Sequence, residues 1–480
     1  MRTPGWLVLG SLSVAVLAST APPARAASPA EDAKAIVEAL VACGTRHSLS
    51  SWTDTKRGIG CGRDVVVRRF EAVENESGKR MRVVVDRFET TAPRTKNVPV
   101  PMENVYAILP GTDPGLERTA FVVSGHYDSM PSNIMDPGTD APGADDDASG
   151  TAVSILAARA LARNSVRATL VFAAVAGEEQ GLLGGKRLLE WLTKQGYTVG
   201  GMITCDIVGA TNGSTDRRVR VFSEGGPDGV DSPGRQMARL VEDVNGKDAV
   251  RLIFRLDRFG RGGDHRPFVE AGLPAVRFTE PLEDYRHEHQ TPRLENGIEY
   301  GDLVKFMDFD FVAETAVAVQ KTLTEMANAP APPRKVTLGG AVTPSAEIFL
   351  EGNKDPERAG YEILWRETTD ARWSVVRTLD ANRAAAGLPA HSSAPPPPSS
   401  SFEENLSSVL SSISTDNHYF AARSVGKNGR RSIAVPAVAA VRRPPGYVAS
   451  EAPKPATSSA PSATPSPAPR PDRPEKLEVR

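Results

Sequence analysis

The stretch Pro142-Gly143-Ala144-Asp145-Asp146-Asp147-Ala148-Ser149-Gly150 places three consecutive carboxylates between a loop and the start of a helix. Pro142 and Gly143 are typical of a tight loop, and the apolar run Thr151–Leu161 behind them predicts the helix. Like charges repel one another, and burying an unpaired carboxylate is very unfavourable. The alternative is an exposed acidic turn, but the flanks on both sides are strongly apolar. The stretch therefore predicts a loop that binds a cation.

Strand and helix patterns alternate on both sides of this loop. Continuous apolar runs at Ala120–Gly125, Ala168–Val175 and Gly201–Cys205 are typical of strands buried on both faces. The capping-box pattern Ser28-Pro29-Ala30-Glu31 predicts a first helix. Further expected elements are Met81–Asp86, Asn104–Leu109, Leu182–Lys194, Val219–Phe222, Pro233–Val244, Val250–Phe254, Pro267–Ala271, Ala275–Phe278 and a last helix over Asp302–Met326. This alternation predicts an α/β domain with a largely parallel, twisted central sheet that helices cover on both faces.

The length of the chain and its first residues predict more than one domain and a signal peptide. A chain of 480 residues is too long for one compact core. Arg2, the short apolar run Trp6–Leu17 and the small-residue site Ala24-Arg25-Ala26 predict a signal peptide over residues 1–26. We therefore expect a secreted or periplasmic protein. No later apolar run is long enough to predict a membrane span.

A change of composition after residue 327 separates the α/β domain, expected over residues 27–327, from a second domain. Residues 328–334 form a Pro/Ala linker, and short alternating segments over 335–442 predict a small all-β sandwich. Gly360–Arg366 followed by Trp373 resembles a fibronectin type III domain. We expect residues 384–401 to be a flexible insertion and the Pro/Ala/Ser-rich residues 443–480 to be disordered. The sandwich is either a passive spacer or a module that binds substrate, cell wall or another surface.

Charge and cysteine content narrow the functional classes. With 57 basic and 59 acidic residues the formal net charge is −2, which offers no basic field for nucleic acid. Export favours oxidation of Cys43 and Cys61 to a disulfide. Cys205 is left unpaired in an apolar strand, where a thiol is usually inert.

Residues able to bind a metal follow four of the expected strands. His126 ends the first apolar run, Glu178-Glu179 follows the second, Asp206 follows the third, and Tyr285–His289 follows Ala275–Phe278. Sites in open α/β sheets form beyond the carboxyl ends of strands, so these side chains should meet Asp146 there. Mixed nitrogen and oxygen donors favour zinc over calcium or magnesium. Five ligands exceed the need of one tetrahedral zinc with an open position, which predicts two zinc ions sharing one carboxylate.

Three motifs resemble one known family. They are Gly-His-Tyr-Asp-Ser at Gly125–Ser129, the acidic stretch Pro142–Gly150, and Ala-Gly-Glu-Glu-Gln-Gly at Ala176–Gly181. Their residues and their order along the chain are similar to those of the secreted co-catalytic di-zinc aminopeptidases. Glutamate carboxypeptidase and glutaminyl cyclase are relatives of this family, and the resemblance covers roughly Ala30 to Met326.

The resemblance implies a role for each candidate ligand. Asp146 would bridge the two zinc ions, His126 and Asp206 would complete one site, and Glu179 with a late histidine would complete the other. The resemblance also implies a cis peptide bond between Asp146 and Asp147. Asp128 would orient His126 from behind, as ligating imidazoles generally require.

Two features depart from the family pattern. The last ligand usually lies in a His-x-x-x-Asp stretch, whereas this chain offers His287 and His289 with no Asp four residues beyond either. We favour His289, with His287 as the alternate, because of the loop length from Phe278. Some relatives place a Tyr before an Asp-His pair, but none precedes Asp264-His265 here, so the oxyanion donor stays open. Asp264 and His265 are expected to hold their loop as structural partners.

The implied activity is removal of N-terminal residues from peptides with a free N-terminus. Two zinc ions sharing a carboxylate can hold a hydroxide, and Glu178 would act as general base and then as general acid. One alternative is a carboxypeptidase for acidic C-termini, with Arg258, Arg261 or Arg286 binding the substrate carboxylate. A second is a single-zinc acyltransferase that resembles glutaminyl cyclase. A third is a secreted binding module with an inactive peptidase domain.

Overall fold

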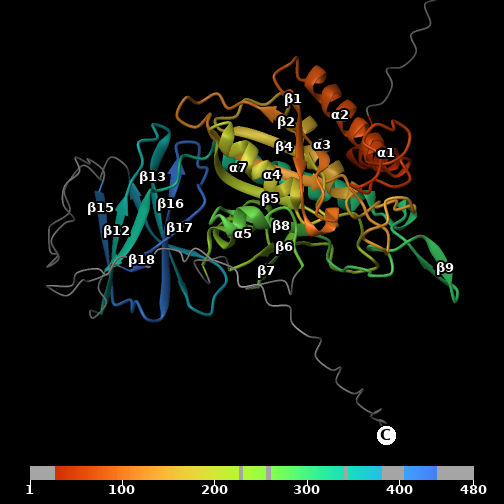
Figure 1. Ribbon diagram of the computed structural model, residues 1–480. Coiled ribbons are helices and arrows are strands. Elements are labelled where there is room, and N and C mark those ends of the chain that lie inside the picture. Colours follow the sequence, from red (N-terminus) through yellow and green to blue (C-terminus); the bar gives the residue numbers. More distant parts are fainter. Residues whose placement is uncertain (1–26, 226–230, 256–260, 340–343, 381–404, 440–480) are drawn as a thin grey trace, which may run out of the picture. The chain divides into compact units, whose positions relative to one another are not determined.

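The computed structural model describes residues 27–225, 231–255, 261–339, 344–380 and 405–439. The expected signal peptide, the insertion 384–401 and the tail 443–480 lie outside these residues. Along the described chain an α/β part is followed by an all-β part (Figure 1). Both belong to one compact unit, which ends at Ala439.

The α/β part is built on one eight-stranded sheet with the order β1-β2-β4-β3-β5-β8-β6-β7. The four central strands β4, β3, β5 and β8 run parallel to one another, whereas β1 with β2, β2 with β4, and β8 with β6 pair antiparallel. The strands are β1 (Arg82–Thr90), β2 (Val100–Leu109), β3 (Thr119–His126), β4 (Thr169–Val175), β5 (Thr198–Cys205), β6 (Val219–Ser223), β7 (Val250–Phe254) and β8 (Ala275–Thr279). The parallel centre confirms the predicted fold class.

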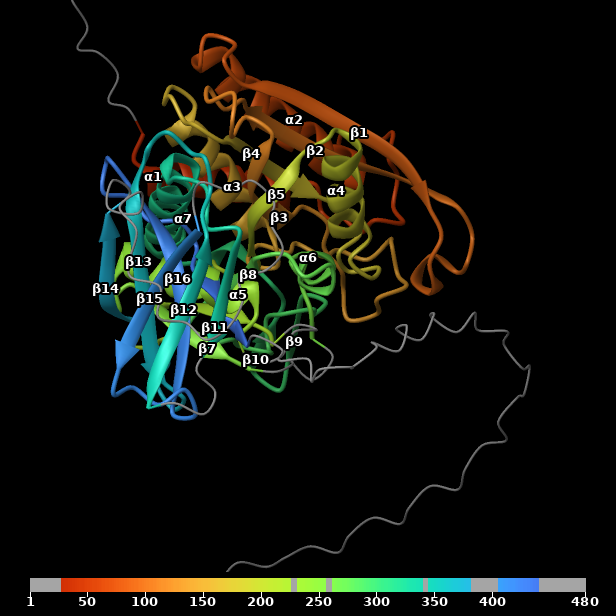
Figure 2. The same ribbon diagram turned by 90° about the vertical axis from the view of Figure 1, so that its left-hand side faces the viewer.

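Helices cover both faces of this sheet. Alternate residues of a strand point to opposite faces, so Val123 packs in one hydrophobic core and Val122 in the other. Figure 2 shows α3 and α7 on one side of β3 and β5, and α4 on the other side. The helices are α1 (Pro29–Val41), α2 (Ile59–Glu76), α3 (Ala148–Leu161), α4 (Leu183–Lys194), α5 (Pro233–Asn245), α6 (Arg266–Glu270) and α7 (Phe309–Asn328).

The helix starts follow their capping residues. Helix α1 has the predicted capping box, in which Ser28 and Glu31 satisfy each other's backbone N–H groups. The prediction of a helix from Asp302 was wrong at its start, because Asp308 caps α7 by accepting from the N–H of Phe311. Ahead of that cap lie the 3-10 turn η2 (Val304–Phe306) and the hairpin β9 (Arg293–Glu295) and β10 (Ile298–Tyr300). A further 3-10 turn, η1, spans Pro93–Thr95.

The all-β part consists of two four-stranded sheets, β15-β12-β11-β18 and β14-β13-β16-β17. Residues from both sheets, such as Ile348 and Ile363, share one hydrophobic core, which makes this part a sandwich. The strands are β11 (Lys335–Gly339), β12 (Ser345–Glu351), β13 (Arg358–Glu367), β14 (Ser374–Asp380), β15 (Asn405–Ser411), β16 (His418–Gly426), β17 (Val435–Pro436) and β18 (Val438–Ala439).

The cysteines are arranged as the sequence predicts. Cys43 and Cys61 form a disulfide that joins the end of α1 to the first turn of α2. Cys205 is buried with a free thiol at the end of β5. In the part of the chain that the structure describes, no helix combines the length and apolar character needed to cross a membrane.

Two glycines allow α3 to approach the sheet closely at the carboxyl ends of β3 and β5. A Cβ atom on Gly150 would lie 2.0 Å from the carbonyl oxygen of Cys205, and a Cβ atom on Gly125 would lie 2.2 Å from the carbonyl carbon of Gly150. Real Cβ atoms cannot approach backbone atoms so closely, so these positions require glycine. This contact brings the acidic loop before α3 to the ends of the parallel strands.

We predict that Gly150→Ala lowers the free energy of unfolding by about 1–3 kcal/mol, because the backbone of β5 and the start of α3 must move apart. Urea denaturation measures this loss. Gly138→Ala is the control, since its Cβ would meet only the Asp136 carboxylate, at 3.5 Å. Equal stability of the two variants would contradict the close packing.

Candidate metal centre

The ends of four parallel strands supply four of the five predicted metal ligands. His126 is the last residue of β3, and Asp206 directly follows β5. Glu179 lies on the loop after β4, and His289 lies on the loop after β8. Because β4, β3, β5 and β8 are neighbours and run in the same direction, their carboxyl ends meet at one edge of the sheet.

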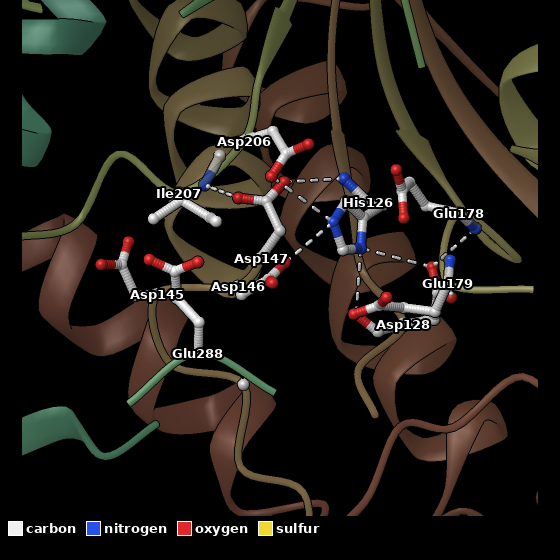
Figure 3. Close-up of polar contacts among 12 residues, drawn as sticks. His126, Asp128, Asp145, Asp146, Asp147, Glu178, Glu179, Asp206, Ile207 and Glu288 are labelled. Carbon is white, nitrogen blue, oxygen red and sulfur yellow. Dashed lines mark hydrogen bonds and ion pairs between the residues drawn. The ribbon is translucent and has the colours of Figure 1, made fainter. Parts of the chain in front are cut away.

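The fifth ligand, Asp146, comes from the acidic loop. The peptide bond between Asp146 and Asp147 is cis, as the family resemblance implied. The side chain of Asp147 turns back to cap α3, where it accepts from the N–H of Gly150 at 2.8 Å, and it also accepts from the N–H of His126 at 2.9 Å. Asp147 thus ties the loop to both α3 and β3 and leaves the side chain of Asp146 to face the strand ends (Figure 3).

The two oxygens of Asp146 face one histidine each. Oδ1 lies 3.1 Å from His126 Nε2, and Oδ2 lies 2.8 Å from His289 Nε2. Asp206 Oδ1 lies 3.9 Å from His126 Nε2, and Glu179 Oε1 lies 3.3 Å from His289 Nε2. The donors therefore form two overlapping sets, His126–Asp146–Asp206 and Asp146–Glu179–His289, each within 4.8 Å. Asp146 belongs to both sets.

His287, the alternate late ligand, lies elsewhere. Its ring stacks on Phe306 with centroids 3.8 Å apart, and its Nδ1 lies 3.9 Å from Asp284 Oδ2. His289 adopts a left-handed backbone with φ of 52°, and this turn carries its ring toward Asp146. The structure therefore brings His289, and not His287, to the other four side chains.

Asp128 connects two of the strand ends. Its carboxylate oxygen Oδ1 lies 3.5 Å from His126 Nδ1, and its carbonyl oxygen lies 3.2 Å from the same nitrogen. The carboxylate also accepts from the N–H groups of Glu178 and Glu179, at 3.4 and 3.3 Å. Asp128 therefore lies where it can orient the His126 ring and hold the Glu178–Glu179 turn together.

The buried carboxylates at the site repel one another, and a bound cation would relieve this repulsion. Burial raises the pKa of Glu178 well above its usual value, and the neighbouring Glu179 carboxylate raises it further. Burial also raises the pKa of Glu179. Burial alone would raise the pKa of Asp146 as well, but His289 and His126 hold it well below its usual value. Within the described residues, buried Glu179 Oε1 accepts no hydrogen bond of good geometry.

This donor set fits a divalent metal ion. Two imidazole nitrogens and three carboxylates converge. Among the described residues the buried Glu179 Oε1 accepts no hydrogen bond and has only the ion-pair contact with His289 Nε2, so it can still bind a metal ion. Mixed nitrogen and oxygen donors suit zinc, whereas calcium and magnesium take oxygen almost exclusively. The two candidate sets share one carboxylate, that of Asp146.

The sequence did not point to two further buried residues. Arg277, in β8, donates from Nη2 to Asp206 Oδ1 at 3.0 Å and from Nη1 to the Gly262 carbonyl oxygen at 2.5 Å. Asp302 accepts from the N–H groups of Asp145 and Asp146 at 2.8 and 2.7 Å. A charged residue inside the apolar run Ala275–Phe278 was the available signal for Arg277. No comparable local signal marks Asp302.

The remaining predicted residues lie around the site. Asp264 is buried, and burial raises its pKa to about 7, while His265 Nε2 lies 2.9 Å from Glu224 Oε2. Arg258, one candidate for a basic pocket, lies outside the described residues. Arg261 pairs with Glu283 at 2.7 Å, and Arg286 pairs with Asp284, so both of these cations already have carboxylate partners.

Comparison with known proteins gives the family. Residues 104–309 match the model of peptidase family M28. A "probable zinc metalloprotease" from Leptosphaeria maculans is 37% identical over 430 residues, which cover 85% of this chain and 94% of that protein. A second protein with this name, from Pyricularia oryzae, is also 37% identical over 430 residues and covers 83% of this chain and 80% of its own length.

Solved structures are similar at a lower level. The aminopeptidase LapA from Legionella pneumophila is 18% identical with a TM-score of 0.47 over 62% of this chain and 72% of that chain. The glutaminyl cyclase from Fimbriiglobus ruber is 20% identical with a TM-score of 0.46 over 64% of this chain and 99% of that chain. The match to the family model and the extended identity to the curated relatives show that this chain belongs to peptidase family M28.

Proposed function

We propose that this protein is a zinc-dependent aminopeptidase whose site holds two zinc ions. The observation that carries the proposal is the pair of donor sets that share Asp146. His126 and Asp206 would bind one ion together with Asp146, and Glu179 and His289 would bind the other. The names of the fungal relatives, "probable zinc metalloprotease", support the choice of zinc.

Zinc ions bound here would supply Lewis-acid chemistry, by making water a better nucleophile and polarising the scissile carbonyl. The chain's own contribution is proton transfer and orientation. Glu178 is next to Glu179 in sequence, and its pKa is raised well above the usual value by burial. A carboxylate with a raised pKa is suited to take a proton from the attacking water and to return it to the leaving amine. Asp128 would hold this turn in place through the two N–H groups that it accepts.

The pairing of the nearby cations favours the amino end of a peptide over the carboxyl end. A carboxypeptidase needs a free basic group for the substrate carboxylate, and neither Arg261 nor Arg286 is free. Arg277 is likewise engaged by Asp206. A free substrate α-amine can instead approach a site rich in carboxylates and metal. The two overlapping donor sets also argue against a single-zinc acyltransferase.

We further propose that the chain is exported. The disulfide between Cys43 and Cys61 supports an oxidising destination, because disulfides persist mainly outside the cytoplasm. The residue pattern of positions 1–26 is the second support.

Replacing Glu178 by Gln should abolish most turnover without loss of metal. The amide cannot accept the proton of water, so we expect kcat to fall by roughly 10²–10⁴ while the zinc content stays the same. Glu190→Gln is the control, because this exposed side chain lies on α4 and only approaches Arg187 at 3.9 Å. Full turnover of the zinc-loaded Glu178→Gln protein would remove this residue from the proposed role.

His289→Ala should reduce the zinc content of the purified protein, whereas His287→Ala should leave it unchanged. The reason is that His289 Nε2 lies 2.8 Å from Asp146 Oδ2, while His287 stacks on Phe306. Atomic absorption on dialysed protein measures the difference. Loss of zinc from the His287 variant alone would reverse the assignment.

The direction of cleavage can be read with three substrates. We expect hydrolysis of leucine p-nitroanilide, none of its N-acetylated form, and no release of glutamate from the C-terminus of a peptide. The acetyl group removes the amine that the proposed site binds, and the third substrate requires a free basic group. Release of C-terminal glutamate without cleavage of leucine p-nitroanilide would establish the carboxypeptidase alternative.

A further inference from the structure

Residues 45–48 form a buried stretch beside the candidate metal centre. Each of the four, Thr45, Arg46, His47 and Ser48, is at most 1% exposed. The stretch follows α1, whereas the match to the family model begins only at residue 104. Its side chains nevertheless contact parts of the chain that carry proposed metal ligands.

Arg46 joins the end of β3 to the acidic loop. Its Nε donates to the carbonyl oxygen of Tyr127 at 2.7 Å, directly after β3. Its Nη2 donates to the carbonyl oxygen of Gly143 at 2.8 Å, and its Nη1 donates to that of the preceding residue at 2.5 Å. One planar guanidinium group thus fixes the spacing between the strand end that carries His126 and the loop that carries Asp146.

The surroundings of Arg46 fix its orientation and keep its charge. A Cβ atom on Gly62 would lie 2.9 Å from Arg46 Cδ, and a Cβ atom on Gly143 would lie 2.8 Å from Arg46 Nη2. Burial lowers the pKa of Arg46 to about 10, and the carboxylates of Asp302 and Asp128 offset part of this effect. The guanidinium therefore stays charged near neutral pH and has little room to turn.

Ser48 holds the carboxylate of Asp128. Its hydroxyl donates to Asp128 Oδ2 at 3.1 Å, and the same oxygen accepts from the N–H of Glu179 at 3.3 Å. The other oxygen, Oδ1, lies 3.5 Å from His126 Nδ1 (Figure 3). Two donors on Oδ2 fix the plane of the carboxylate, so that Oδ1 faces the ring of His126.

His47 contacts the turn after β4. Its Nδ1 accepts from the N–H of Leu49 at 3.1 Å, so Nε2 carries the proton and donates to the carbonyl oxygen of Ile134 at 2.9 Å. The same Nε2 lies 3.3 Å from the side-chain amide of Gln180. Residues 45–48 therefore contact three parts of the chain that carry proposed ligands, namely the end of β3, the acidic loop and the turn after β4.

The stretch is itself anchored by neighbours outside the site. The disulfide between Cys43 and Cys61 ties its start to α2, and the carbonyl oxygen of Gly44 accepts from the N–H of Ala141 at 3.0 Å. The backbone of Thr45 forms a parallel bridge with Ala141 as well. A support that is held in this way can order the ligands before a metal ion binds, which lowers the cost of binding.

We propose that Arg46 and Ser48 are positioning residues of the metal centre, which act through the ligands. Arg46 sets the spacing of His126 and Asp146, and Ser48 sets the orientation of His126 through Asp128. The assignment rests on the proposed two-zinc site and adds the residues that preorganise it. Loss of either contact should weaken zinc binding, because binding must then also order the ligands.

Ser48→Ala tests the hydroxyl with little change of volume. We expect a zinc dissociation constant to rise by roughly ten-fold to a hundred-fold, measured by competition with a chromophoric chelator. Cobalt in place of zinc gives a second measurement, because its visible absorption bands depend on coordination geometry. These bands should shift or lose intensity in the variant.

Ser77→Ala is the matched control. This serine is also buried, and its hydroxyl donates to the carbonyl oxygen of Glu74 at 2.6 Å and accepts from the N–H of Met81 at 3.2 Å, at the end of α2. Its loss should lower the stability of the metal-free protein in urea, while the zinc constants and the cobalt bands stay those of the wild type.

Arg46→Lys keeps the charge and loses the planar fork, so it should weaken zinc binding by a similar factor. Arg57→Lys is its control, because exposed Arg57 donates to the carbonyl oxygen of Gly138 at 2.8 Å and pairs with Asp140 at 2.6 Å. This control should bind zinc as the wild type does. If Arg46→Lys does not fold, Ser48→Ala decides alone.

The outcomes separate positioning from the proposed function. Wild-type zinc constants and cobalt bands in folded Ser48→Ala would overturn the positioning role of Ser48, and the same result in folded Arg46→Lys would overturn that of Arg46. If the wild type binds zinc but hydrolyses no aminoacyl nitroanilide, the aminopeptidase function fails, while weaker zinc binding by the variants still supports positioning. A wild-type protein that binds neither zinc nor cobalt would contradict both proposals.

Discussion

The structure depends on carboxylates that the fold forces together. Asp146, Glu179 and Asp206 come from three separate loops, and the parallel strands β4 and β5 deliver Glu179 and Asp206 to one edge of the sheet. Water is largely excluded there, because all three side chains are almost completely buried. Carboxylates in such surroundings repel one another and favour protonation unless a cation joins them. The two histidines and the shared carboxylate are what the proposed pair of metal ions would bind.

The supports around this site explain why its geometry is fixed. Gly125 and Gly150 let α3 contact the strand ends, and Asp147 bonds to both elements. Asp128 spans His126 and the Glu178–Glu179 turn, and Arg277 holds Asp206. These residues bind no substrate in the proposed mechanism. They hold the donor atoms in place before a metal ion arrives, which reduces the cost of ordering the site.

Much of this arrangement could be predicted from sequence, and the limits have physical causes. Apolar runs followed by His126, Glu179 and Asp206 reveal strand ends, because strands buried on both faces consist mostly of apolar residues. Arg277 and Asp302 could not be assigned, since their partners lie 71 and 157 residues away and depend on packing alone. The start of α7 was placed too early, at Asp302 instead of after Asp308. Asp308 caps the helix by accepting from the N–H of Phe311.

The central claim is that two zinc ions flank Asp146, and anomalous diffraction from crystals at the zinc absorption edge tests it most directly. The account predicts two anomalous peaks, one among His126, Asp146 and Asp206 and the other among Asp146, Glu179 and His289. A single peak, or peaks away from Asp146 in zinc-loaded crystals, would contradict it.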